Sequence, residues 1–212
     1  MTGAAPGAAR EAVLDRIRAA LVDRPAAVPI PRDYETTMPA WIDLPARFMD
    51  RVHDYRATIE RTTPDRLPQV IAAAFASHHA RRIATPAGVP KGWFETADVE
   101  RVSDDPALSH VDLDGLDGTI TGCAVAIAET GTIVLDAGPD QGRRALSLLP
   151  DLHVCVVRVE QVVGTVPEAL ARLDPGRPQT WISGPSATSD IELQRVEGVH
   201  GPRRLAVILV DS

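Results

Sequence analysis

Hydrophobic positions along this chain alternate between helical spacing and short continuous runs. Val13, Leu14, Ile17 and Leu21 recur at the spacing of an amphipathic helix over residues 9–23. Apolar runs bounded by turn residues predict strands at 55–61, 82–85, 119–128, 132–136, 152–159, 179–183 and 205–210. Helical segments are expected at 46–53, 64–79, 139–149 and 166–173. This alternation predicts a layered α/β fold whose sheet is mostly parallel and flanked by helices.

A proline-rich segment separates the first helix from the rest. Five prolines lie between residues 25 and 45, which favours an extended strap over regular structure. Trp41, Ile42 and Leu44 are apolar side chains that would attach this strap to the domain or to another subunit. We therefore predict an N-terminal helix and proline-rich extension over residues 1–54 and an α/β domain over 55–212.

Composition narrows the classes of function. The chain has 212 residues, is 44% hydrophobic and carries a net charge of −7. That charge argues against general nucleic-acid binding and against adhesion to an anionic membrane, although a local basic pocket for a small anion stays possible. No apolar run approaches the ~20 residues of a membrane-spanning helix, and no signal peptide is recognisable. A cytoplasmic location is expected.

The cysteines and histidines predict no metal site. Cys123 and Cys155 each lie in an apolar run and belong to no CxxC pair, so both are expected to be buried free thiols. A disulfide between them stays open, because spacing alone does not give distance. His153 begins an apolar run typical of a strand buried on both faces and is interpreted as a core or strand-end residue. We expect no metal and no cofactor in this chain.

The loop that follows the run at 179–183 is the main candidate for ligand binding. It is rich in glycine and hydroxyl side chains, and Ser189 with Glu192 has the spacing of a helix capping box. The backbone N–H groups before such a helix can bind an anion. The candidate ligand-binding residues here are Gly184, Pro185, Ser186, Thr188, Ser189, Asp190 and Glu192. An ordinary capped connection is the alternative.

Two further segments carry candidate catalytic residues. Glu129 lies in a turn between two apolar runs, where it could serve as base, nucleophile or hydrogen-bond acceptor. The residues that follow it, Thr130, Gly131 and Thr132, are further candidate ligand-binding residues. The alternative is a hairpin turn with a solvated glutamate. His200 stands between a valine and a glycine, close after the ligand-binding loop, and is the second catalytic candidate. Its alternative is a structural role.

Adjacent arginines mark another predicted helix start. Arg143 and Arg144 are candidate countercharges for a phosphate or carboxylate. Alternatively, Arg143 faces solvent while Arg144 pairs with an acid. Because ligands of open α/β sheets gather at strand carboxyl ends, we expect this helix start, the Glu129 turn and the loop at 184–192 to meet at one end of the sheet.

Several of these segments together resemble the LUD-domain family. The resemblance rests on Ala126–Leu135, on Gly142–Leu146 with Leu148–Pro150, on Thr180–Glu192 and on Arg195–Pro202. It covers the chain from about Tyr55 onward. It implies a fold like that of the ribose-phosphate isomerase, glucosamine-phosphate deaminase and CoA-transferase group, with 5-formyltetrahydrofolate cyclo-ligase as another relative.

The resemblance also implies a function. It implies a role in an L-lactate utilization system that oxidises L-lactate to pyruvate together with two partner proteins that contain iron–sulfur clusters. This chain lacks the Cys-rich motif of longer family members, so it would be a non-redox ligand-binding or accessory subunit, and an oligomer is possible. The alternative is a free-standing enzyme acting on a small phosphorylated or acyl-CoA-like substrate, with Glu129 catalytic.

Overall fold

The computed structural model describes residues 6–22, 28–185, 187–188, 196–197 and 201–212. The chain divides into two units, Met1–Tyr34 and Glu35–Ser212. The first unit contains helix α1 (Pro6–Ala20), at the position that the apolar spacing predicts. Its apolar residues Val13, Ile17 and Leu21 are exposed. In the part of the chain that the structure describes, no helix combines the length and the hydropathy needed to cross a membrane.

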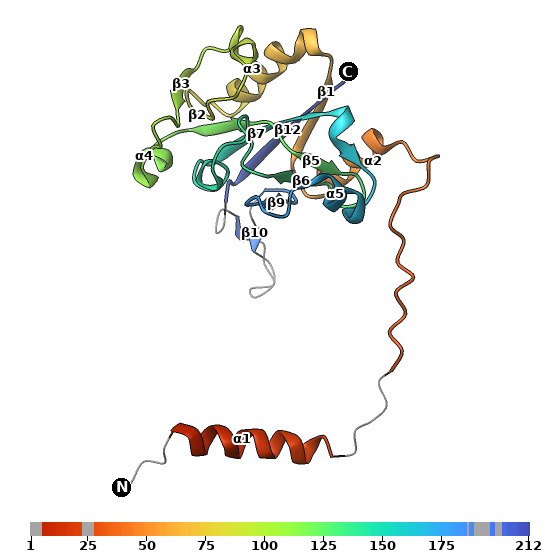
Figure 1. Cartoon of the computed structure of the whole chain (residues 1–212). Helices are drawn as coiled ribbons and strands as arrows, with labels where there is room; N and C mark the ends of the chain where they lie inside the picture. Colours follow the sequence, from red (N-terminus) through yellow and green to blue (C-terminus); the bar gives the residue numbers. More distant parts are fainter. Residues whose placement is uncertain (1–5, 23–27, 186, 189–195, 198–200) are drawn as a thin grey trace. The chain divides into compact units, whose positions relative to one another are not determined.

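A six-stranded sheet forms the centre of the second unit (Figure 1). Its order is β1 (Thr58–Thr62), β12 (Arg204–Val210), β7 (Leu152–Arg158), β4 (Gly118–Thr121), β2 (Arg82–Thr85) and β3 (Glu100–Ser103). Every neighbouring pair in it is parallel. The prediction of a mostly parallel sheet in a layered α/β fold is confirmed.

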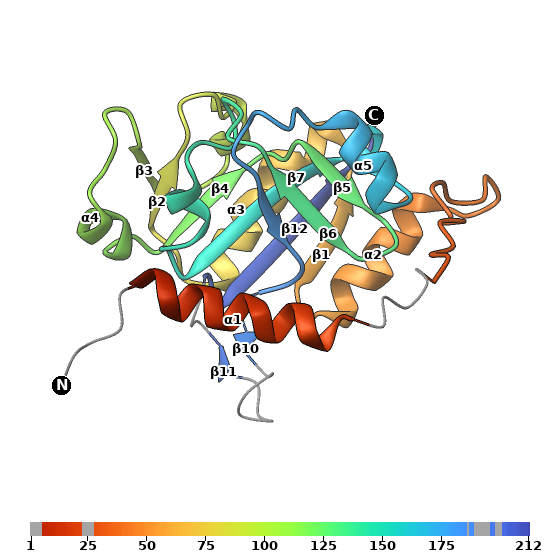
Figure 2. The same cartoon turned by 60° about the horizontal axis from the view of Figure 1, so that its bottom comes forward.

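A smaller, mixed sheet lies against one face of the central sheet (Figure 2). Its order is β8 (Val162–Val163), β5 (Val125–Ile127), β6 (Thr132–Leu135) and β9 (Thr180–Ile182). The apolar run at 119–128 therefore supplies strands to two sheets, because the chain leaves the central sheet after Thr121 and enters the smaller one at Val125. Further on, β10 (Ala187–Thr188) and β11 (Val196–Glu197) form an antiparallel pair.

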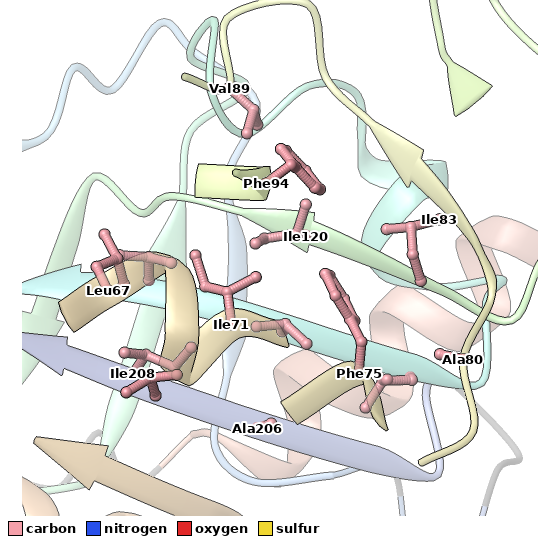
Figure 3. Packing of buried hydrophobic residues seen from close by; sticks show 14 of the residues in the cluster. Leu67, Ile71, Phe75, Ala80, Ile83, Val89, Phe94, Ile120, Ala206 and Ile208 are labelled. Carbon is pink, nitrogen blue, oxygen red and sulfur yellow. The ribbon is translucent and has the colours of Figure 1, made fainter. Parts of the chain in front are cut away.

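Two hydrophobic clusters cover the faces of the central sheet. Helix α3 (Leu67–Ser77) places Ile71 and Phe75 against Ile120 and Ile208 on one face (Figure 3). The opposite face packs against the smaller sheet and helix α2 (Leu44–Asp54). Strand β7 contributes alternate residues to both clusters, as expected of a strand buried on both faces.

Helix α2 belongs to this second unit. Its Phe48 and Val52 are almost fully buried in the cluster shared by the two sheets. The division of the chain after Tyr34 thus lies twenty residues before the boundary predicted after residue 54. Of the expected attachment residues, Leu44 packs partly against the core, whereas Trp41 is 84% exposed.

The helix predicted over residues 139–149 is wrong. Only the short 3-10 helix η3 (Arg144–Ser147) forms there. Gly142, inside this segment, has a φ of +67°, which a right-handed helix does not allow. The Gln141 side chain accepts a hydrogen bond from the backbone N–H of Asp136 and so stabilises an irregular loop. The predicted helix that begins near Ser189 lies outside the described residues.

The remaining helices and 3-10 turns connect the strands. Helix α5 (Val166–Arg172) forms as predicted and has a capping box from Thr165 and Glu168. The other short elements are η1 (Pro64–Arg66), η2 (Lys91–Phe94), α4 (His110–Asp114) and η4 (Val159–Gln161). The edge strand β3 and helix α4 have no counterpart in the predicted elements, because they are short and mostly polar.

Candidate functional site

A pocket of about 340 Å³ lies between the central sheet and β9. His153 and Leu205, the second residues of β7 and β12, stand on the central-sheet side, and the 179–185 segment forms the other side. The described residues that line it are Arg144, Ser147, Leu148, His153, Gln179, Thr180, Trp181, Ile182, Ser183, Gly184, Pro185, Gly201, Pro202 and Leu205. The volume falls in the range of small-molecule sites.

The two adjacent arginines have different environments. Arg143 Nε and Nη2 donate to the two carboxylate oxygens of Asp104 over 2.8 and 2.9 Å, and Nη2 also donates to the Leu108 carbonyl. Arg144 lines the pocket and has no ion-pair partner among the described residues. The proposed anion-binding role is therefore available to Arg144. The alternative, with Arg143 in solvent and Arg144 paired, is wrong, because the ion pair belongs to Arg143.

The Arg143–Asp104 pair is a structural link. The Asp104 side chain is only 7% exposed. Burial by itself would raise the pKa of Asp104, but hydrogen bonds from Arg143 and from the Leu108 backbone lower it overall. The same partner raises the pKa of Arg143. Both groups thus stay charged, and the pair joins the loop after β6 to the segment after β3.

His153 is the most buried polar residue of the pocket. It is 1% exposed, and its Nε2 lies 2.8 Å from Thr121 Oγ1. Burial lowers the pKa of His153 to about 4, so the ring is neutral near pH 7. Sequence reasoning assigned this residue to the core. Its one distinguishing signal was a histidine within an otherwise apolar run.

The Glu129 turn lies beside the start of the 184–192 loop. Strands β6 and β9 are antiparallel neighbours, and Thr132 Oγ1 is 2.8 Å from Ser183 Oγ and 2.7 Å from Thr130 Oγ1. Gly131 has a φ of +61° and packs closely against the α2 backbone. Glu129 itself is exposed and is not among the residues that line the pocket.

The structure brings together part of the predicted site. Gly184, with a φ of +83°, and Pro185 line the pocket with Arg144. Thr188 lies in β10. Ser186, Ser189, Asp190, Glu192 and His200 lie outside the described residues.

Whether the Glu129 turn, the Arg143–Arg144 segment and the loop at 184–192 meet at strand carboxyl ends depends on the direction of each strand. Strands β5 and β9 both pair antiparallel with β6, so their carboxyl ends, with Glu129 and Ser183, lie at one edge of the smaller sheet. Strand β6 ends at the opposite edge, but the loop that follows it places Arg144 in the pocket beside Gly184 and Pro185. In the central sheet, His153 and Leu205 place the pocket at the amino ends of β7 and β12.

Both cysteines are buried free thiols, as predicted. The Cys155 thiol and burial raise the pKa of Cys123, so its thiol form is strongly favoured. Among the residues with described positions, no group of three or more His, Cys, Asp or Glu could hold a metal ion.

Comparison with known proteins identifies the family. Residues 110–210 match the model of the LUD domain. A relative from Deinococcus radiodurans named "Lactate utilization protein C" is 51% identical over 198 residues, which cover 91% of each chain. Relatives with the same name from Geobacillus kaustophilus and Bacillus subtilis are 35% and 37% identical over 50% and 44% of this chain, and over 49% and 42% of their own length.

A solved structure supports the same assignment. The crystal structure of a DUF162 family protein from Deinococcus radiodurans has a TM-score of 0.68 to this chain at 48% identity. The match covers 79% of this chain and 96% of that one. On sequence and fold, this chain belongs to the LUD-domain family, together with relatives named lactate utilization protein C.

Proposed function

We propose that this chain is the non-redox, ligand-binding component of a cytoplasmic system that oxidises L-lactate to pyruvate, and that iron–sulfur partner proteins carry the electrons. The names of its relatives support the lactate context. Iron–sulfur clusters are held by sets of Cys thiolates, and this chain has two cysteines. The redox step therefore falls to the partners.

The pocket beside β9 supplies the ligand site in this proposal. Arg144 is the one formally charged residue among the described residues that line it. A guanidinium can bind a carboxylate through two parallel hydrogen bonds. Hydroxyl side chains such as Ser147 and Thr180 supply neutral polar contacts, and Trp181 supplies an apolar wall. A small anionic organic acid fits this chemistry. The observation that supports the proposal most directly is that Arg144 lines the pocket without an ion-pair partner among the described residues.

Binding measurements test the ligand site. L-lactate and pyruvate are titrated into the full chain by NMR, with Arg144→Ala as the test variant. We expect binding to weaken by roughly tenfold or more, because a charge-assisted bidentate contact is lost. Arg61→Ala is the matched control, since Arg61 lies on β1 in an exposed pair with Asp211. Equal affinity of Arg144→Ala and wild type would contradict the proposal.

Turnover measurements test the accessory role. The purified chain alone, given L-lactate and an artificial electron acceptor, should show no turnover. Lactate oxidation should appear only when the partner proteins are added. Turnover by the chain alone would favour the free-standing enzyme with Glu129 catalytic, and Glu129→Gln would then abolish it. Glu129 stands outside the pocket lining, which makes this second function the less favoured one.

A further inference from the structure

A line of hydrogen-bonding groups leads from the pocket into the space between the sheets. His153 Nε2 is 2.8 Å from Thr121 Oγ1, and Thr121 Oγ1 is 3.8 Å from Cys155 Sγ. Cys155 Sγ in turn is 3.6 Å from the carbonyl oxygen of Gly122. All three side chains are buried, with exposures of 1% or less. The other ring nitrogen of His153, Nδ1, has no hydrogen-bond partner among the described residues.

The last group of this line sets its direction. The Gly122 carbonyl can only accept, so the Cys155 thiol donates to it. The sulfur can then accept from the Thr121 hydroxyl, which has one hydrogen to donate. The 2.8 Å distance between Thr121 Oγ1 and His153 Nε2 fits either direction of donation, and when the hydroxyl donates to the sulfur its oxygen accepts from His153 Nε2–H. In a neutral imidazole one nitrogen carries the hydrogen, so Nδ1 keeps a bare lone pair.

We propose that His153 Nδ1 accepts a hydrogen bond from the ligand and so makes the pocket selective for 2-hydroxy acids over 2-oxo acids. The proposal rests on the proposed function, in which Arg144 holds the carboxylate. A 2-hydroxyl group can donate to the Nδ1 lone pair. A 2-oxo group offers lone pairs alone and would face the nitrogen without a hydrogen between them, and such a mismatch in a polar site is strongly disfavoured.

The neutral state of the ring is part of this selectivity. A protonated imidazole would donate from both nitrogens and favour the 2-oxo acid instead. Burial keeps the pKa of His153 near 4, so the acceptor form prevails at pH 7. Thr121 acts as a positioning residue, because it holds the hydrogen on Nε2 without reaching the ligand.

Two measurements on the full chain test the inference. Long-range ¹H–¹⁵N correlation spectra of ¹⁵N-histidine-labelled protein should identify His153 as the Nε2–H tautomer. In titrations at pH 7, L-lactate should bind roughly tenfold more tightly than pyruvate. Propionate, which lacks any 2-oxygen, should bind more weakly than lactate.

A pair of isosteric variants links the tautomer to the selectivity. Thr121→Val removes the acceptor for Nε2–H and should reduce the preference for lactate. Thr119→Val is the matched control: Thr119 is buried on the same strand and lies opposite His153, but its hydroxyl donates to the Ala84 carbonyl. Thr119→Val should leave the preference unchanged.

The outcomes separate this inference from the proposed function. An Nδ1–H tautomer in the wild-type spectrum, or pyruvate bound as tightly as lactate, would overturn the role of His153 while carboxylate binding at Arg144 stands. Binding of none of the three acids by the wild-type chain would overturn the carboxylate pocket and this inference with it. The tautomer spectrum needs no variant and therefore does not depend on whether Thr121→Val folds.

Discussion

At the residue scale, burial and partners decide what each polar side chain does. Arg143 and Arg144 are adjacent and chemically identical, yet one is held by Asp104 and the other lines a pocket. His153 is uncharged near pH 7 because burial lowers its pKa. Sequence pattern identified the arginines as a pair of candidates, and tertiary contacts distinguished them.

The Arg143–Asp104 pair should contribute to stability. We expect Arg143→Ala to lower the free energy of unfolding by about 1–3 kcal/mol, because the largely buried Asp104 carboxylate loses the two hydrogen bonds from Arg143 and keeps only the one from the Leu108 backbone N–H. Arg82→Ala is the control, since its pair with Glu100 is exposed and worth about 0–1 kcal/mol. Urea unfolding of both variants gives the comparison. A loss in Arg143→Ala no larger than in the control would contradict the structural role.

Burial of His153 should make stability depend on pH. Its pKa is about 4 in the folded chain, against an ordinary value of 6.5. Between about pH 6.5 and 4 the unfolded chain therefore binds a proton at His153 that the folded chain does not. The free energy of unfolding is unaffected by this residue above pH 6.5 and falls as the pH is lowered toward 4. The loss should reach roughly 3 kcal/mol.

His153→Gln isolates this contribution. Glutamine does not titrate, and its amide can still donate to Thr121. Denaturant unfolding of both proteins between pH 7 and 4.5 should give a flatter profile for the variant. If the free energy of unfolding changed with pH equally in both proteins, burial of His153 would not be the source of the pH dependence.

At the element scale, prediction succeeded where local pattern decides the structure and failed where distant contacts decide it. Strand β2 agrees with its apolar pattern because three of its four residues are buried, and helix α5 agrees because its capping box and the burial of Ala169 act together. The helix predicted over 139–149 does not form because Gly142 has a positive φ and lies against Pro86, a residue far away in the chain. Proline at the start and end of a segment indicates a boundary, but it does not distinguish a helix from an irregular loop.

The turn that carries Glu129 should depend on Gly131. A Cβ at this position would come within 2.7 Å of the Arg51 carbonyl carbon and 2.9 Å of the Val52 nitrogen, at a φ of +61°. We expect Gly131→Ala to cost at least about 2 kcal/mol, from left-handed strain and displacement of α2.

Gly92→Ala provides the comparison for this turn. Its Cβ would meet the Glu95 side chain at an ordinary 3.5 Å. Thermal unfolding should show a clear loss for Gly131→Ala and a small change for Gly92→Ala. Similar melting temperatures for the two variants would show that the contact between the turn and α2 is not restrictive.

At the scale of the whole molecule, the second unit contains its own core. Phe48 and Val52 of α2 are buried with residues of both sheets. The Thr36 carbonyl accepts a hydrogen bond of 2.8 Å from Thr165, so the chain joins this unit well before α2. These contacts favour a boundary near residue 34 for a separable N-terminal segment.

Two truncations distinguish the boundaries. Removal of residues 1–34 should leave cooperative unfolding with a melting temperature near that of the full chain, because no described core residue is lost. Removal of residues 1–54 also deletes α2, and losing buried Phe48 alone should cost roughly 3–5 kcal/mol. Circular dichroism melting and the oligomeric state of each protein provide the measurement. Cooperative folding of the shorter protein would support the boundary after residue 54.

The sequence alone determined the features that depend on local pattern. Alternating apolar runs and helical spacing predicted the parallel α/β core, and the segments around Glu129 and after Ser183 carried the resemblance to the LUD-domain family. The tertiary structure decided which residues share a site. Arg144 and His153 are only nine residues apart in the chain, and the tertiary structure decided that both line one pocket with the distant segment 179–185. The apolar run around His153 indicated its burial, which lowers its pKa, but its position in the lining of a pocket is set only when distant segments pack together.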